Sequence, residues 1–213
     1  MRDRLAATLY WGLRALARGL FAVGFGFRVT GRQHLPHRGA FLLACNHVSY
    51  IDPVVLAAAC PRRLVFLAKA SLFAIPVLGW LLRLTCCIPI QRREADIGLR
   101  EAVKRIQHGQ PLAMFPEGGR QFSGQLGIAK PGVGWLALAG EVPLIPVLLQ
   151  GTFQALPPGA RWLRRAKIRV AFGEQIRYSG PPLTGSAVGA ADSAQALAQQ
   201  VNDTWRHLTL TTA

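Results

Sequence analysis

The sequence predicts an α/β fold in which a mixed, largely parallel sheet is flanked by helices. From Arg28 onward, short apolar runs alternate with longer segments of helical periodicity, the order expected of strand and helix layers. The length of 213 residues fits one such domain. We therefore expect residues 28–213 to form the domain and residues 1–27 to form an N-terminal helical segment that associates with a membrane.

Seven short apolar runs predict the strands of the sheet. They are residues 27–30, 41–45, 64–67, 87–90, 112–115, 144–149 and 168–172. Helices are predicted between them at 53–60, 71–83, 95–108 and 131–139, and a last helix at 187–208. This last helix carries Leu197, Val201 and Trp205 at four-residue spacing, which predicts one apolar face closing over the core.

The N-terminal residues 5–27 are mostly apolar, but Arg14 and Arg18 interrupt them. The longest uncharged piece, 19–27, is far shorter than the roughly 20 residues of a membrane-spanning helix. An amphipathic helix lying in the membrane interface fits better, the alternative being a helix packed on its own domain. The side chains expected at the lipid headgroups are Leu5, Leu9, Leu13, Leu16, Leu20, Tyr10, Trp11 and Phe21.

The chain is strongly basic and unusually apolar. It has 25 basic against 10 acidic residues, a net charge of +15 and 51% hydrophobic residues. Nucleic-acid modules need a basic stripe on a reading element or a zinc motif, whereas here the arginines flank apolar runs, as at 161–165. The composition therefore indicates a phospholipid surface as partner and no nucleic acid.

The four cysteines predict neither a metal site nor a disulfide framework. Cys45, Cys60, Cys86 and Cys87 show no Cys-x-x-Cys spacing, and the last two are adjacent within an apolar run. Such cysteines are typical of buried thiols in a reducing compartment.

His47 and Asp52 form the first candidate for chemistry. His47 follows an apolar strand and Asp52 precedes Pro53, which predicts a strand-to-helix loop with Asp52 as helix N-cap. In a turn the carboxylate could orient the imidazole as a general base. Spacing alone allows an equally good alternative, in which Asp52 only caps the helix and His47 only packs.

Residues 115–120 (Phe-Pro-Glu-Gly-Gly-Arg) form the second candidate. They follow a predicted strand, so they lie at the carboxyl edge of the sheet, where open α/β sheets bind ligands. Arg120 could bind a phosphate, with Glu117 anchoring that arginine or contacting the acceptor. The alternative is an ordinary turn with a surface ion pair.

These motifs make the chain resemble the glycerophospholipid acyltransferases, whose best-known members are the 1-acyl-glycerol-3-phosphate acyltransferases. Four ordered blocks over roughly residues 28–175 support the resemblance. They are Asn46, His47 and Asp52 in the first, 87–92 ending in Arg92 in the second, 115–120 in the third and the Val-Pro-Leu-Ile-Pro of 142–146 in the fourth.

The resemblance implies an O-acyltransferase of phospholipid biosynthesis on the cytoplasmic face of the inner membrane. Acyl-CoA or acyl-carrier protein would be the co-substrate, with no metal or other cofactor, and a lysophospholipid the acceptor. The first candidate acceptor is 1-acyl-glycerol-3-phosphate (lysophosphatidic acid), which would give phosphatidic acid. His47 and Asp52 would be catalytic, and the substrate-binding residues would be Lys69, Arg92, Glu117, Gly118, Gly119 and Arg120.

Two departures from the family pattern bear on the acceptor. Gly119 stands where the family usually has threonine, and Gln121 where serine is common. Another lyso-lipid or alcohol acceptor, or a non-catalytic lipid-binding protein, are the alternatives. A hydrolase using Cys45 or Ser49 is a third, although no Gly-x-Ser-x-Gly nucleophile elbow occurs.

Overall fold

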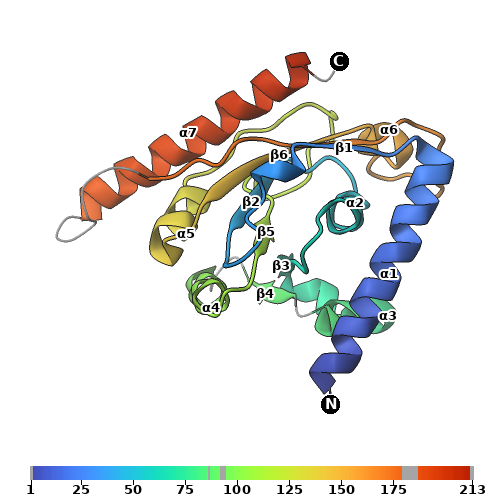
Figure 1. Ribbon diagram of the computed structural model, residues 1–213, viewed down its shortest axis with the longest axis horizontal. Helices are drawn as coiled ribbons and strands as arrows, with labels where there is room; N and C mark the ends of the chain where they lie inside the picture. Colours follow the sequence, from blue (N-terminus) through green and yellow to red (C-terminus); the bar gives the residue numbers. More distant parts are fainter. Residues whose placement is uncertain (1, 86, 92–94, 179–186, 212–213) are drawn as a thin grey trace.

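The computed structural model describes residues 2–85, 87–91, 95–178 and 187–211 (Figure 1). Its sheet has seven strands in the order β1-β7-β6-β2-β5-β3-β4. All neighbouring strands are parallel except the antiparallel pair β6 and β7. The strands are β1 (Arg28–Thr30), β2 (Leu42–Cys45), β3 (Val65–Lys69), β4 (Ile88–Ile90), β5 (Leu112–Met114), β6 (Leu144–Gln150) and β7 (Arg169–Phe172). The predicted mixed, largely parallel sheet is confirmed, strand by strand.

Helices cover both faces of this sheet, as Figure 1 shows. They are α1 (Arg2–Phe25), α2 (Asp52–Ala59), α3 (Pro76–Leu84), α4 (Ala95–Gln107), α5 (Gly132–Gly140), the single turn α6 (Thr152–Ala155) and α7 (Ala187–Thr211), with 3₁₀ turns η1 (Arg32–His34) and η2 (Ala70–Ala74).

Strand β2 shows how the two cores are divided between the faces. Leu43 and Cys45 belong to a cluster with α1 and α2, whereas Leu42 and Ala44 belong to a cluster with α4, α5 and α7. Successive side chains of a strand point to opposite faces, and all four residues of β2 are fully buried. The strand that precedes His47 is therefore held rigidly from both sides.

The predicted helix at 71–83 is wrong as one element, because it is broken in two. The 3₁₀ turn η2 ends at Ala74, Ile75 is extended, and α3 begins at Pro76. A residue before proline is disfavoured in the helical region by the proline ring, and Ile75 takes that position. Gly79 then allows α3 to fold back onto η2, because a Cβ there would overlap the carbonyl oxygen of Phe73.

Helix α1 packs on the domain along one stripe. Tyr10 and Phe21, which we expected at the lipid headgroups, are instead buried at 4% and 6% exposure. The Tyr10 hydroxyl accepts a hydrogen bond from the Leu64 amide at 3.2 Å, and burial raises the pKa of Tyr10 to about 12. The expectation for these two side chains was wrong. The helix has two apolar stripes, and Tyr10 and Phe21 belong to the one that packs on the domain.

The second stripe of α1 is exposed. Leu13, Leu16 and Leu20 are 42%, 61% and 60% exposed. At 100° per residue their mean direction lies about 100° around the helix from that of Tyr10 and Phe21. Among the described residues, no helix is long and apolar enough to cross a bilayer. The side chain of Leu5 lies outside the described part of the chain.

Two arginines join α1 and η1 to the carboxyl end of α2. The Arg14 Nε donates to the carbonyl oxygens of Ala57 and Cys60, at 3.2 and 2.8 Å. The Arg32 Nε donates to the Ala59 carbonyl at 3.1 Å. Cations are favoured at a helix carboxyl terminus, where the last carbonyls lack intrahelical partners. Arg14 therefore stabilises the packing of α1 on α2.

Candidate active site

Three parallel strands bring the predicted site residues to one edge of the sheet. Strand β5 lies between β2 and β3 and is parallel to both. Parallel strands end at the same edge, so the loop after β2, the loop after β5 and the last residue of β3 meet there. These three segments carry His47, Arg120 and Lys69 respectively.

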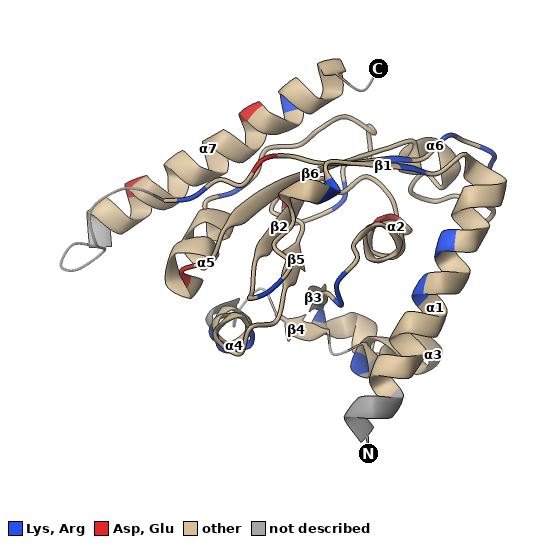
Figure 2. Ribbon diagram, viewed as in Figure 1, with Lys and Arg blue, Asp and Glu red and all other residues tan. Residues whose placement is uncertain are grey.

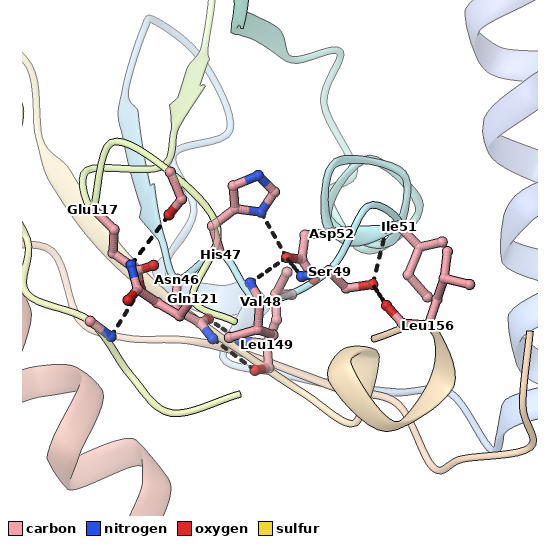
Figure 3. A network of polar contacts seen from close by, with 12 residues as sticks. Asn46, His47, Val48, Ser49, Ile51, Asp52, Glu117, Gln121, Leu149 and Leu156 are labelled. Atoms are coloured by element: carbon pink, nitrogen blue, oxygen red, sulfur yellow. Dashed lines mark hydrogen bonds and ion pairs between the residues drawn. The ribbon is translucent and has the colours of Figure 1, made fainter. Parts of the chain in front are cut away.

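His47 and Asp52 are in direct contact, as the sequence predicted (Figure 3). The His47 Nδ1 lies 2.8 Å from the Asp52 Oδ2. Asp52 is fully buried, whereas the His47 side chain keeps 18% of its surface exposed. Within the described residues Nε2 has no hydrogen-bond partner, and Figure 3 shows that side of the ring facing away from the loop. This nitrogen is the one available to a substrate.

The Asp52 carboxylate points back into the loop rather than capping α2. Helix α2 begins at Asp52 itself, its N-cap is Ile51, and no side chain caps it. The Oδ2 atom instead accepts the amides of Val48 and Ser49 at 2.8 and 2.7 Å. The predicted N-cap role is therefore wrong, because the loop curls around the carboxylate and supplies amides that lie closer to it.

Two further side chains fasten this loop to the domain. Asn46 pairs with the backbone of Leu149 in β6, donating to its carbonyl at 3.1 Å and accepting its amide at 2.7 Å. The Ser49 hydroxyl donates to the Leu156 carbonyl at 2.6 Å. Both polar residues are buried, at 2% and 0% exposure. The loop is thus anchored on either side of His47.

The loop after β5 packs directly on His47. The Phe115 ring stacks on the imidazole with centroids 4.1 Å apart, and the Gln121 amide donates to the His47 carbonyl at 2.8 Å. The sequence did not identify Phe115 as a site residue. Phe115 could be recognised only from the contact between the two loops, and that contact follows from the pairing of β2 with β5.

Glu117 is buried beneath the two loops, at 5% exposure. Its Oε1 accepts the Gly127 amide at 3.3 Å, whereas its Oε2 is buried and has no hydrogen-bond partner within the described residues. Burial raises its pKa to about 7, and the nearby polar groups of His47, Gln121 and Gly127 oppose this rise. The structure places this carboxylate on the backbone of its own loop, and no ion pair joins it to Arg120.

Arg120 lies against the His47 loop through an aromatic contact that the sequence did not predict. Its guanidinium carbon is 3.5 Å from the centroid of the Tyr50 ring and 5.7 Å from that of Phe122. Its Nη1 is buried and has no hydrogen-bond partner in the described residues. Such a guanidinium is suited to an oxyanion, because its planar fork binds phosphate with two parallel hydrogen bonds.

The glycines of 115–120 let the turn pass close to other groups. Gly118 has φ of +77°, a conformation that side chains disfavour, and the Lys130 Nζ lies 3.0 Å from where its Cβ would be. Gly119 is exposed with open space around it. Lys130, an exposed cation at this turn, was not singled out from the sequence.

Of the other two predicted cations, Lys69 and Arg92, the structure describes only Lys69. Lys69 is exposed and pairs in register with Ile90 across β3 and β4. Arg92 follows β4 in the sequence but lies outside the described residues. No group of three or more His, Cys, Asp or Glu side chains in the described ranges is arranged to hold a metal ion.

The nucleophiles considered for a hydrolase are unsuited to that role. Cys45 is fully buried, and burial raises the pKa of its thiol well above the usual value, so it is held as a thiol. The Ser49 hydroxyl is buried and donates to a backbone carbonyl. Cys60 is also buried, Cys87 is partly exposed, and Cys86 lies outside the described residues.

Comparisons with known proteins find relatives of this chain. The chain is 29% identical to the chloroplastic 1-acyl-sn-glycerol-3-phosphate acyltransferase BAT2 of Brassica napus, over 70% of this chain and 44% of that protein. It is 24% identical to the 1-acyl-sn-glycerol-3-phosphate acyltransferase of Bacillus subtilis, over 84% of this chain and 87% of that protein. The chain thus spans less than half the length of the Brassica relative.

The fold also matches a solved structure. The crystal structure of the 1-acyl-sn-glycerophosphate (LPA) acyltransferase PlsC from Thermotoga maritima aligns with a TM-score of 0.81 at 22% identity, covering 100% of this chain and 83% of that one. Residues 26–150, more than half of the chain and including every described site residue above, match the family profile described as Acyltransferase. The chain belongs to this acyltransferase family.

Proposed function

We propose that the protein is an O-acyltransferase that moves a fatty acyl group from acyl-CoA or acyl-carrier protein to the hydroxyl of a lysophospholipid. The leading acceptor is 1-acyl-glycerol-3-phosphate, the substrate that the names of the relatives state for those proteins. The contact of His47 with Asp52 at 2.8 Å, on the sheet edge shared with Arg120, carries this proposal.

The pair supplies general-base catalysis. The Asp52 carboxylate accepts a hydrogen bond from the His47 Nδ1–H, which leaves Nε2 with its lone pair toward the substrate. Nε2 takes the acceptor's hydroxyl proton as the oxygen attacks the thioester carbonyl. The carbon–sulfur bond then breaks, and the leaving thiolate takes the proton back from Nε2. No acyl-enzyme forms, so both substrates must be bound together.

Arg120 binds the phosphate of the acceptor, supported by Lys69 at the end of β3 and by Arg92. The Nη1 of Arg120 without a partner and the parallel register of β3 and β5 support this arrangement. Gly119 offers no hydroxyl at the same turn. This difference favours, as a second candidate, an acceptor whose anionic group is held by backbone amides and guanidinium alone.

The protein works at a phospholipid surface, on the cytoplasmic face of the inner membrane. The exposed stripe of Leu13, Leu16 and Leu20 on α1 supports the surface location, since such a stripe is stable in the headgroup boundary of a bilayer. The apolar acceptor and product would then enter and leave through the lipid.

The test offers purified protein, in detergent, acyl-CoA and acyl-carrier protein with a panel of acceptors that includes lysophosphatidic acid, and reads the products by mass spectrometry. His47→Ala should lose at least ~100-fold in turnover, the usual contribution of a general base. Arg120→Ala should chiefly raise the acceptor KM. Full activity of His47→Ala, or a ping-pong pattern, would contradict the mechanism, and binding of lysophosphatidic acid without turnover would indicate a lipid-binding protein.

A further inference from the structure

The segment between α6 and β7 carries an exposed tip of basic and apolar side chains, residues 161–165 (Arg-Trp-Leu-Arg-Arg). Trp162 is 80% and Leu163 54% exposed, and the three arginines are exposed as well. Within the described chain none of these five side chains has a hydrogen-bond or ion-pair partner. A tryptophan this exposed in water is a recognition feature rather than a packing one.

Backbone hydrogen bonds hold this 161–165 tip beside the carboxyl end of α1. The Arg164 amide donates to the Ala155 carbonyl at 2.8 Å, and the Ile168 amide donates to the Phe25 carbonyl at 2.9 Å. Figure 1 shows the segment passing by the upper end of α1, and Figure 2 shows its Lys and Arg positions in blue at the same place. The tip therefore lies near the carboxyl end of α1, where Val23 is 91% exposed.

We propose that the 161–165 tip is a second membrane contact, which binds the headgroup layer of an anionic bilayer next to α1. Tryptophan is favoured at the headgroup level because one end of its ring is apolar and the other polar. The arginines Arg161, Arg164 and Arg165 would bind lipid phosphates, and Leu163 would enter the acyl boundary. This proposal rests on the membrane-surface location proposed above.

The composition of the tip separates a lipid surface from the other anionic partners. An acidic carrier protein would be bound by the arginines, but it would leave the alternation of Arg, Trp and Leu side chains without a role. The tip also has no acidic residue that could orient a protein partner by charge pairing. In an anionic bilayer the cations and the apolar side chains are all satisfied at one depth.

The experiment measures vesicle flotation of the full chain with phosphatidylcholine alone and with one third phosphatidylglycerol added. The variant Arg164→Gln/Arg165→Gln should bind the anionic vesicles at least about tenfold more weakly, since each cation near the surface contributes about fivefold. The control Arg100→Gln/Lys104→Gln removes two exposed cations from α4, on the other face of the sheet, and should bind almost normally. Trp162→Ala should weaken binding to both kinds of vesicle.

Activity in detergent distinguishes this proposal from the proposed function. The Arg164→Gln/Arg165→Gln variant should transfer acyl groups to a micellar acceptor at the unaltered rate, while its activity on acceptor in anionic vesicles falls with its binding. Equal vesicle binding by the tip variant and the α4 control would overturn the second contact. So would normal vesicle binding together with lost activity only when acyl-carrier protein is the donor, which would assign the tip to that protein.

Discussion

The Arg120 guanidinium lies 3.5 Å from the centroid of the Tyr50 ring. The cation that we propose for the acceptor phosphate is thus held by an aromatic face, and within the described residues it has no carboxylate partner. A carboxylate would neutralise the guanidinium, whereas a ring face positions it and leaves its charge available. Because Tyr50 lies between His47 and Asp52 in sequence, the ring that positions Arg120 and the proposed general base lie in one loop.

The first prediction concerns Tyr50. Tyr50→Ala should raise the acceptor KM about fivefold, corresponding to the loss of a cation–π contact, with little change in kcat. Tyr50→Phe should restore the wild-type KM, because the ring face is kept. Steady-state kinetics at saturating donor measure both values. A loss of kcat with unchanged KM in Tyr50→Ala would show that the ring supports the loop and not the arginine.

Asp52→Asn should lower kcat at least about 100-fold while the fold is retained. The amide oxygen can still accept the Val48 and Ser49 amides, and the amide nitrogen takes the place of Oδ1, which has no partner in the described residues. The amide oxygen could still accept the His47 Nδ1–H, but the negative charge that stabilises the imidazolium would be gone. Turnover is compared with the melting temperature of the same sample, and Asp203→Asn on exposed α7 serves as the control. Retained turnover would remove Asp52 from the mechanism.

Glu117 should make stability depend on pH. Its pKa is raised from 4.5 to about 7 in the folded protein, so the folded state binds the proton more tightly than the unfolded state. The associated stability is fully present below about pH 4.5 and is lost as pH rises through about 7. Glu117→Gln, which cannot ionise, should show a smaller fall in melting temperature between these values. Parallel pH profiles of the two proteins would contradict the shift.

The packing of α5 on α7 predicts a sharp difference between two glycines of one helix. A Cβ at Gly134 would overlap the carbonyl oxygen of Ala194, whereas a Cβ at Gly132 would meet no atom within 4 Å. Gly134→Ala should therefore destabilise the protein by about 2 kcal/mol, as overpacking does. Gly132→Ala should be neutral or slightly stabilising, because alanine favours helix. Urea unfolding followed by circular dichroism measures both.

The sheet could be predicted strand by strand because buried parallel strands are short apolar runs bounded by turns. The break before Pro76 was missed because the apolar periodicity continues across it. The division of α1 into a buried and an exposed stripe was missed for a related reason. Its composition shows many apolar residues, but only the packed structure shows that Tyr10 and Phe21 are buried while Leu16 faces outward.

In the candidate site, too, the sequence predicted a contact within one loop but not the contacts between two loops. His47 and Asp52 are five residues apart, so one loop conformation decides their contact. Their spacing left two interpretations open, and the other ordered motifs favoured the contact that the structure shows. The contacts of Phe115 with His47 and of Arg120 with Tyr50 join two loops about seventy residues apart in sequence. They depend on strand order, which local pattern does not contain.

Helix α2 connects the candidate active site to the N-terminal helix α1. Its first residue is the carboxylate that orients His47, and its last carbonyls are gripped by Arg14 of α1. Eight residues of α-helix measure about 12 Å, and a helix this short is stiff. Helix α2 therefore links the Asp52 carboxylate to α1 as one rigid element. A tilt of α1 on a bilayer would then shift Asp52 and change its contact with His47.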